Sequence, residues 1–318
     1  MGTEIDKIHH VGHVVQDMET ALELYRKLGF VSTPPAYPTM AEQEGETPKP
    51  LGAANAHIDF VDNFIEIVTI VKEGGRIPDD AHLIPLSAPP AVRSRIIASI
   101  KRTVATISGC LARFEGTHIL VFSTFDAITS AARLEQGKVG HGGVSTVQRP
   151  VETKTGTQMV PVRLLEVDDD QVSEGRLAFA ENPPSNILKT KIHTDHPNGA
   201  IELVETILCV EDPELIACVE RYQLYLGVEP QTEGREFIFD LGGGRIMIIS
   251  KSHLTDFLPG EALPSLPGFV GYVVKVRDLS VTRLYLESNG FSVLETARGD
   301  VFVPGASLHG TTLIFRQG

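Results

Sequence analysis

The chain opens with a histidine-rich run whose side chains can bind a metal ion or move a proton. IHHVGHVV places His9, His10 and His13 within five positions, among valines that favour a strand. Because side chains alternate between the two faces of a strand, His10 shares a face with Gly12 and Val14. His9 and His13 point the other way. The pattern predicts one reactive imidazole on this face, with a small neighbour that leaves room for a ligand.

Other groups capable of chemistry lie on further strand-like runs. Glu66 lies in FIEIV, His118 in GTHILVF and Glu181 in LAFAEN. Three more residues are candidates for contact with a substrate: His57 on an alternating strand, His141 in the Gly-rich segment GKVGHGGVS, and Arg149, whose guanidinium suits a carboxylate.

A pattern of strand, Asp, amphipathic helix and Gly recurs four times in the sequence. The structural units that this pattern predicts must position the candidate residues. Asp suits the N-cap because its carboxylate accepts from the free amides of the first turn, and Gly suits the left-handed residue after a helix. The pairs are Asp17 and Gly29, Asp126 (or Thr124 as the cap) and Gly137, Asp212 and Gly227, and Asp278 and Gly290. Strand-like runs follow each helix. The four units span about 5–75, 116–185, 201–252 and 266–318.

Two segments fall outside these units. Apolar residues at three- and four-residue spacing predict an inserted helix at about 90–114, after the first unit. Residues 183–200 form a linker between the halves. We therefore predict an N-terminal domain at 1–190 and a C-terminal domain at 200–318.

The segment IHHVGHVVQDMETALELYRKLGF resembles the opening of a vicinal-oxygen-chelate module. GAANAHIDFVDNFIEIV, QRPVETKTG and HPNGA resemble the glyoxalase-like branch of that superfamily, which includes glyoxalase I, extradiol dioxygenases and bleomycin-resistance proteins. The resemblance implies an α+β fold of four βαβββ modules, paired into two cup-shaped half-barrels, with a metal ion in a cup. The inserted helix is then expected to cap the N-terminal cup.

The resemblance also implies a ligand set. Family ligands lie on the first strand, seven residues before the capping Asp, and as a carboxylate on the last strand. These places correspond to His10, Glu66, His118 and Glu181, although His118 lies eight residues before Asp126. Two imidazoles and two carboxylates suit Zn²⁺, Ni²⁺, Mn²⁺, Fe²⁺ or Co²⁺. Glu181 or Glu66 would act as the catalytic base, and we favour Glu181.

The second half lacks such a set, because its first-strand places hold Glu205 and Gly271. We predict a degenerate C-terminal metal site and a metal-dependent lyase, isomerase or epimerase acting on a small oxygenated substrate. The alternatives are a non-heme iron dioxygenase and a non-catalytic binding or resistance protein. Extradiol dioxygenases hold their iron in the second half of the chain, on two His and one Glu. That triad is missing from the second half of this chain, which argues against ring cleavage by that route.

Composition and net charge limit the classes of molecule that the chain is expected to bind. The 318 residues carry a formal net charge of -13, which argues against nucleic-acid and anionic-membrane binding. Three scattered cysteines and the absence of a signal-like start predict a cytoplasmic protein without a disulfide framework. A small-molecule substrate is the expected partner, and a homodimer is left open.

Overall fold

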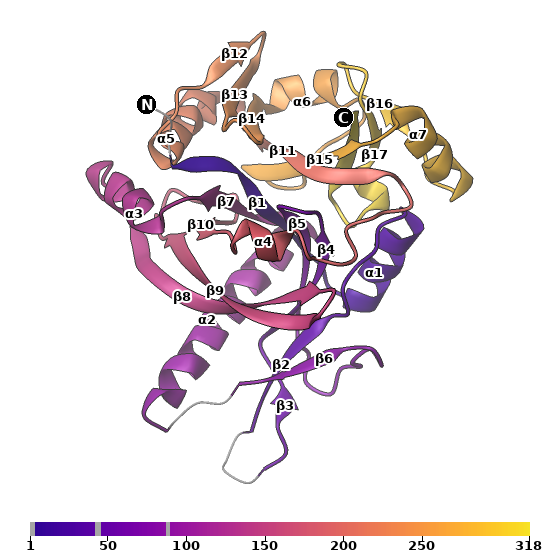
Figure 1. Ribbon diagram of the computed structural model, residues 1–318. Helices are drawn as coiled ribbons and strands as arrows, with labels where there is room; N and C mark the ends of the chain where they lie inside the picture. Colours follow the sequence, from indigo (N-terminus) through magenta and orange to yellow (C-terminus); the bar gives the residue numbers. More distant parts are fainter. Residues whose placement is uncertain (1–3, 42–45, 87–89) are drawn as a thin grey trace.

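The computed structural model describes residues 4–41, 46–86 and 90–318 and has a mixed α+β fold with two multi-stranded sheets (Figure 1). The first sheet has the order β3-β2-β4-β5-β1-β7-β10-β9-β8, with β6 paired to β2. Its strands are β1 (Ile5–Val14), β2 (Ala36–Met40), β3 (Lys49–Pro50), β4 (Ala53–Asp59), β5 (Phe64–Ile70), β6 (His82–Pro85), β7 (Gly116–Thr124), β8 (His141–Thr153), β9 (Gly156–Val167) and β10 (Arg176–Glu181).

The second sheet has the order β12-β13-β14-β11-β15-β18-β17-β16. Its strands are β11 (Ala200–Val210), β12 (Gln231–Glu233), β13 (Glu236–Asp240), β14 (Arg245–Ser250), β15 (Gly268–Val276), β16 (Leu294–Glu295), β17 (Val301–Val303) and β18 (Thr312–Gln317). The predicted boundary at 190–200 therefore lies in the segment between the two sheets.

The two sheets repeat one pairing scheme. In each, two central strands run antiparallel, β1 with β7 and β11 with β15. Each central strand has a parallel neighbour from its own unit: β5 beside β1, β10 beside β7, β14 beside β11 and β18 beside β15. A helix separates the members of each such pair in the chain, as the strand–helix–strand repeat predicts.

The helices begin largely where the repeat predicts. They are α1 (Met18–Lys27), α2 (Pro90–Arg113), α3 (Ala127–Gln136), α4 (Ser185–Leu188), α5 (Leu215–Leu226), α6 (Lys251–Phe257) and α7 (Leu279–Ser288). Asp17, Asp126 and Asp278 each cap a helix by accepting from a first-turn amide. Asp212 does not cap α5. It opens a short 3-10 turn, and its carboxylate accepts from Ser252.

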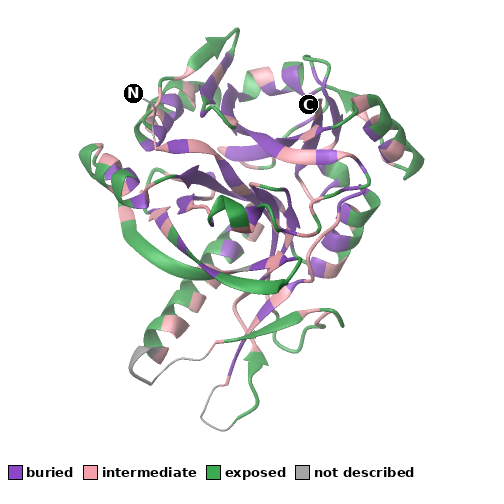
Figure 2. Cartoon of the chain, viewed as in Figure 1, coloured by how far each residue is buried: buried purple, intermediate pink, exposed green. Residues whose placement is uncertain are grey.

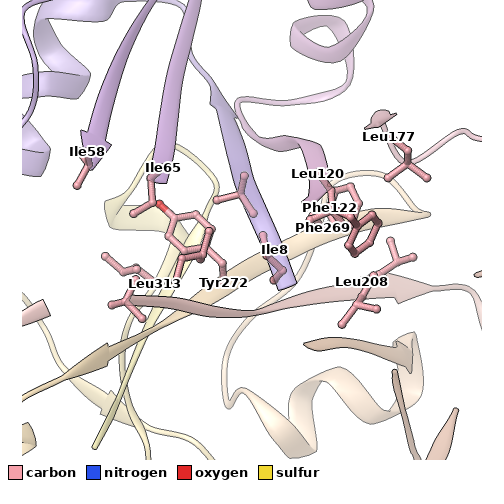
Figure 3. Packing of buried hydrophobic residues seen from close by; sticks show 14 of the residues in the cluster. Ile8, Ile58, Ile65, Leu120, Phe122, Leu177, Leu208, Phe269, Tyr272 and Leu313 are labelled. Carbon is pink, nitrogen blue, oxygen red and sulfur yellow. The ribbon is translucent and has the colours of Figure 1, made fainter. Parts of the chain in front are cut away.

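The main core lies between the two sheets, which pack face to face through β1, β5 and β7 on one side and β11 and β15 on the other. Figure 3 shows Ile8, Ile65 and Phe122 of the first sheet meeting Leu208, Phe269 and Leu313 of the second. Burial of this shared apolar surface stabilises both sheets together, at roughly 25 cal/mol per Å² removed from water. Burial therefore fixes which face of the central strands meets the core.

The opposite faces of the two sheets differ. On the second sheet, Leu254 and Phe257 of α6 pack against Met247 and Phe302 in a separate apolar cluster. On the first sheet, Ile107 and Cys110 of α2 cover only part of that face, against Val14, Ile119 and Val121. Residues of α2 thus pack on part of this face, and a cavity lies on the rest of it. No helix in the described ranges combines the length and hydropathy needed to cross a membrane.

Gly271 on β15 shows how closely the strands of the second sheet approach. A Cβ at this position would lie 1.9 Å from the carbonyl oxygen of Thr312 on β18. We expect Gly271→Ala to lower the free energy of unfolding by about 3 kcal/mol, because the backbone must shift to admit a methyl group. Urea denaturation measures this change. Gly142→Ala is the matched control, since no described atom lies within 4 Å of its Cβ. Equal midpoints for the two variants would contradict the expectation.

Candidate functional site

A cavity of about 480 Å³ opens on the free face of the first sheet. Its lining comes from both ends of the strand order, from β2, β4 and β5 at one end and from β8, β9 and β10 at the other. Arg149 on β8 reaches Phe64 on β5 and Asp59 on β4, although β8 and β4 are far apart in the sheet. The sheet therefore curls around the cavity, and β8 with β9 forms a largely exposed ribbon along one side (Figures 1 and 2).

Three of the sequence-predicted residues meet in this cavity on three adjacent strands. The sheet order β4-β5-β1 sets His57, Glu66 and His10 side by side on one face. His57 and Glu66 are direct cross-strand partners. Nε2 of His10 lies 3.8 Å from Oε2 of Glu66, and Nε2 of His57 lies 3.9 Å from Oε1. The Asn55 amide also donates to Oε1 at 2.7 Å.

Burial controls the charge of this group. It lowers the pKa of His10 to about 3, so the imidazole is neutral at physiological pH. Burial alone would raise the pKa of Glu66, but contacts from His57, His10 and Asn55 bring it to about 2. The cavity therefore holds an ionised Glu66 carboxylate beside the neutral imidazole of His10, and this carboxylate can bind a cation.

His9 also lines the cavity, contrary to the prediction from simple alternation. The pairing of β1 with β7 shifts register between Ile8 and His10, so a β-bulge turns both His9 and His10 toward the same face. Nδ1 of His9 lies 2.7 Å from Nδ1 of His10, within hydrogen-bond distance. His13 lies beyond the bulge and points to the core face, where its ring contacts the hydroxyl of Tyr25 on α1.

His118 does not reach the cavity. On β7 the cavity face carries Ile119 and Val121, whereas Leu120 and Phe122 enter the core between the sheets. His118 falls at an irregularity in the pairing of β7 with β1, between Thr117 and Ile119, and it is not among the lining residues. Its buried Nε2 contacts the carbonyl oxygen of Phe114 at 2.9 Å.

Glu181 also lies outside the cavity, because of strand alternation on β10. Ala178 and Ala180 of β10 line the cavity, so alternation turns Glu181 to the opposite side. Its carboxylate accepts from the Ala127 amide at the start of α3 and from Arg163. A negative charge at a helix N-terminus stabilises the helix, so the Glu181 carboxylate stabilises the start of α3.

The third sequence-predicted residue outside the cavity is His141. Its ring lies at the start of β8, with Nε2 3.5 Å from the Glu135 carboxylate of α3, and it is not among the lining residues. Arg149, by contrast, lies in the cavity. The predicted four-ligand set of His10, Glu66, His118 and Glu181 is thus not brought together.

Several lining residues were not anticipated. Asn55 and Asp59 flank His57 on β4, and Phe64 and Arg176 complete the polar end of the cavity. A signal for two of them was present in NAHID, where polar residues recur at every second position of a buried strand. Phe64 carries a similar signal, since it lies two residues before Glu66 on β5, whereas Arg176 has none, because its place in the cavity depends on the curl of the sheet.

The donor types on this face suit a divalent ion. His10, His57 and Glu66 supply two imidazole nitrogens and a carboxylate, and a proton on Nδ1 of His10 donated to His9 would leave Nε2 free as a ligand. The N–O distances of 3.8 and 3.9 Å exceed the roughly 3.0–3.4 Å that ligand atoms show around an ion with bonds of about 2.1 Å. Within the described part of the chain, no group of three or more His, Cys, Asp or Glu side chains is already spaced to hold a metal ion.

Solved structures similar to this chain share its fold at low sequence identity. A hypothetical protein from Staphylococcus aureus matches with a TM-score of 0.60 and 10% identity, over 99% of this chain and all of that one. A mutant 4-hydroxymandelate synthase from Streptomyces coelicolor matches at 0.57 and 12%, covering 99% and 92%. The Mn(II)-bound glyoxalase from Novosphingobium aromaticivorans matches at 0.54 and 10%, covering 99% and 83%.

No curated protein sequence matches the chain. The family model of the glyoxalase-like domain matches residues 8–226, which include every strand of the first sheet after the start of β1 and continue through α5. This range contains all the residues that line the cavity. The chain is therefore a member of the glyoxalase-like domain family.

Proposed function

We propose that the cavity of the first sheet is the active site of a metal-dependent lyase, isomerase or epimerase acting on a small oxygenated substrate. The observation that carries the proposal is the buried, ionised Glu66 between His10 and His57. The proposal includes the arrangement of the elements as four modules in two half-barrels. The Mn(II)-bound glyoxalase among similar structures supports the choice of a divalent ion.

In this proposal His10, His57 and Glu66 hold the ion, and His57 takes the place that the sequence assigned to His118. When bound, a divalent ion supplies a Lewis acid that polarises a carbonyl oxygen or stabilises an enediolate. Glu66 is the proposed base, and its carboxylate would accept a proton from the substrate on leaving the ion. Glu181 is not proposed for either role, because its carboxylate binds the start of α3.

The test is the metal content of the full chain purified with added Mn²⁺, Zn²⁺ or Fe²⁺. We expect His10→Ala and Glu66→Gln to lose at least ~90% of the bound metal, because removal of one of three ligands weakens a site by well over tenfold. His118→Ala and Glu181→Gln are matched controls that remove the same residue types from outside the cavity. Both controls should keep the wild-type stoichiometry, with folding of all four variants checked by circular dichroism.

Two outcomes would reject this assignment. One is metal at wild-type stoichiometry in both folded His10→Ala and Glu66→Gln. The other is loss of metal from folded His118→Ala, which would restore the ligand set predicted from the family pattern.

A further inference from the structure

We infer that the ligand of this cavity is a singly charged carboxylic acid with an apolar body, whose carboxylate binds Arg149. The inference rests on the proposed function only in taking this cavity as the active site. It names a substrate class, which neither the metal ligands nor the family resemblance specifies.

Arg149 is a largely buried cation without a matching anion. Its guanidinium carbon lies 4.1 Å from the centre of the Phe64 ring, and Nη1 lies 3.5 Å from Nε2 of His9. The nearest carboxylate contact is Asp59, at 3.9 Å from Nη2. Its Nε is buried and has no hydrogen-bond partner among the described residues. Buried polar groups are normally satisfied, so these spare donors point to a ligand oxygen.

Asp59 does not neutralise Arg149, because another cation already holds it. Nζ of Lys191 lies 2.7 Å from Oδ1 of Asp59 and also donates to the Phe60 carbonyl oxygen. Lys191 is almost completely buried, so this ion pair belongs to the protein itself. The Asp59–Lys191 pair is neutral by itself, so Arg149 has no carboxylate within hydrogen-bond distance that is free to pair with it.

The other arginine that lines the cavity has a carboxylate partner of its own. Arg176 makes two hydrogen bonds to the Glu166 carboxylate, at 2.6 and 3.2 Å. Of these two arginines, Arg149 is the one without a carboxylate within hydrogen-bond distance. One available charge favours a carboxylate over a phosphate dianion, and the planar fork of arginine matches the two carboxylate oxygens.

The remaining walls are apolar. Val121, Val162 and Ala178 are buried on the floor, and Ile84, Val147 and Met159 line the mouth with 36%, 42% and 57% of their surface exposed. Exposed apolar side chains along an open cavity favour an apolar ligand that continues toward solvent. The structure therefore suits a carboxylate head near Phe64 and a hydrocarbon body extending to the mouth.

The position of Arg149 also orients the acid. Phe64 lies under both Arg149 and His10, with the His10 ring stacked at 4.4 Å from its own. A carboxylate on Arg149 thus places the adjacent carbon atoms beside His9, His10 and Glu66. An oxygen on one of those carbons would face the proposed metal ligands.

The experiment is isothermal titration calorimetry at pH 7.5 on the full chain, both chelator-treated and loaded with Mn²⁺. The probes are butanoate, octanoate, octanamide and octyl phosphate. We expect octanoate to bind about 10- to 100-fold more tightly than octanamide, because the amide lacks the charge that Arg149 requires. Each added methylene should improve the affinity about two- to fourfold, and octyl phosphate should bind more weakly than octanoate.

Arg149→Gln should remove the preference for octanoate over octanamide. Arg163→Gln, which deletes an exposed arginine from the neighbouring strand outside the cavity, should keep it. If Arg149→Gln does not fold, Arg149→Lys and the comparison of acid with amide on the wild type still decide the question. Equal binding of acid and amide by the wild type, tighter binding of octyl phosphate, or an unchanged preference in Arg149→Gln would overturn the inference.

These results separate the two proposals. Loss of metal in His10→Ala together with equal binding of acid and amide would leave the metal site standing and reject the carboxylate. Selective octanoate binding by a protein that retains no metal would reject the metal site and support the carboxylate.

Discussion

Lowering the pH from 7.5 to 5.5 should reduce the free energy of unfolding by at least about 4 kcal/mol. Burial lowers the pKa of His10 and His13 to about 3 and that of His196 to about 4. In the unfolded chain these imidazoles titrate near 6.5. Between these values the unfolded state binds more protons, so stability is lost as the pH falls below about 6.5. Each histidine contributes about 1.4 kcal/mol over this interval.

His13 illustrates why these rings stay neutral. Its Nδ1 contacts the Tyr25 hydroxyl at 2.8 Å and its Nε2 contacts the His309 carbonyl oxygen at 3.1 Å. The Tyr25 hydroxyl also lies 2.5 Å from that of Tyr272 in the second sheet. Neutral His13 can donate from Nε2 and accept at Nδ1, whereas a protonated ring has no lone pair left for Tyr25.

The measurement is urea denaturation of chelator-treated protein at pH 7.5, 6.5 and 5.5. His13→Asn is expected to be less stable at every pH, but its loss of stability between pH 7.5 and 5.5 should be about 1.4 kcal/mol smaller. His193→Asn replaces an exposed histidine and should leave the wild-type dependence unchanged. A wild-type loss below about 1 kcal/mol over the interval would show that these histidines are not kept neutral by the fold.

The second large effect concerns Glu174, which joins the loop before β10 to α5 of the second half. Its fully buried carboxylate accepts from both terminal nitrogens of Arg221, at 2.9–3.1 Å, and from the Tyr222 hydroxyl at 2.8 Å. Glu174→Ala should lower the free energy of unfolding by about 3–5 kcal/mol, because it leaves a guanidinium buried without its anion. Urea denaturation with an unchanged m-value would measure this loss directly.

Two further variants make this prediction specific. Glu287→Ala breaks an exposed pair with Arg283 on α7, and it should cost no more than about 0.5 kcal/mol. The double variant Glu174→Met with Arg221→Met should recover much of the loss, because no buried charge remains unpaired. A cost below about 1 kcal/mol for Glu174→Ala would mean that this ion pair does not hold the two halves together.

Much of the fold could be predicted because its signals are local. Asp17, Asp126 and Asp278 begin helices, since a carboxylate at the N-cap binds amides only two or three residues away. The prediction for Asp212 was wrong because Ser252, forty residues later, supplies another partner for its carboxylate. Distant partners of this kind leave no trace in the neighbouring sequence.

The same distinction between local signals and distant partners applies to the candidate site. The sequence by itself determined that His10, His57 and Glu66 lie on strands and that alternation limits which neighbours share their face. Only the tertiary structure decided that His9 joins them through a bulge, that His118 and Glu181 turn away, and that Arg149 reaches Phe64 across the curled sheet. The physical reason is that alternation is a property of one strand, whereas the choice of the cavity face depends on register, bulges and the packing of the two sheets.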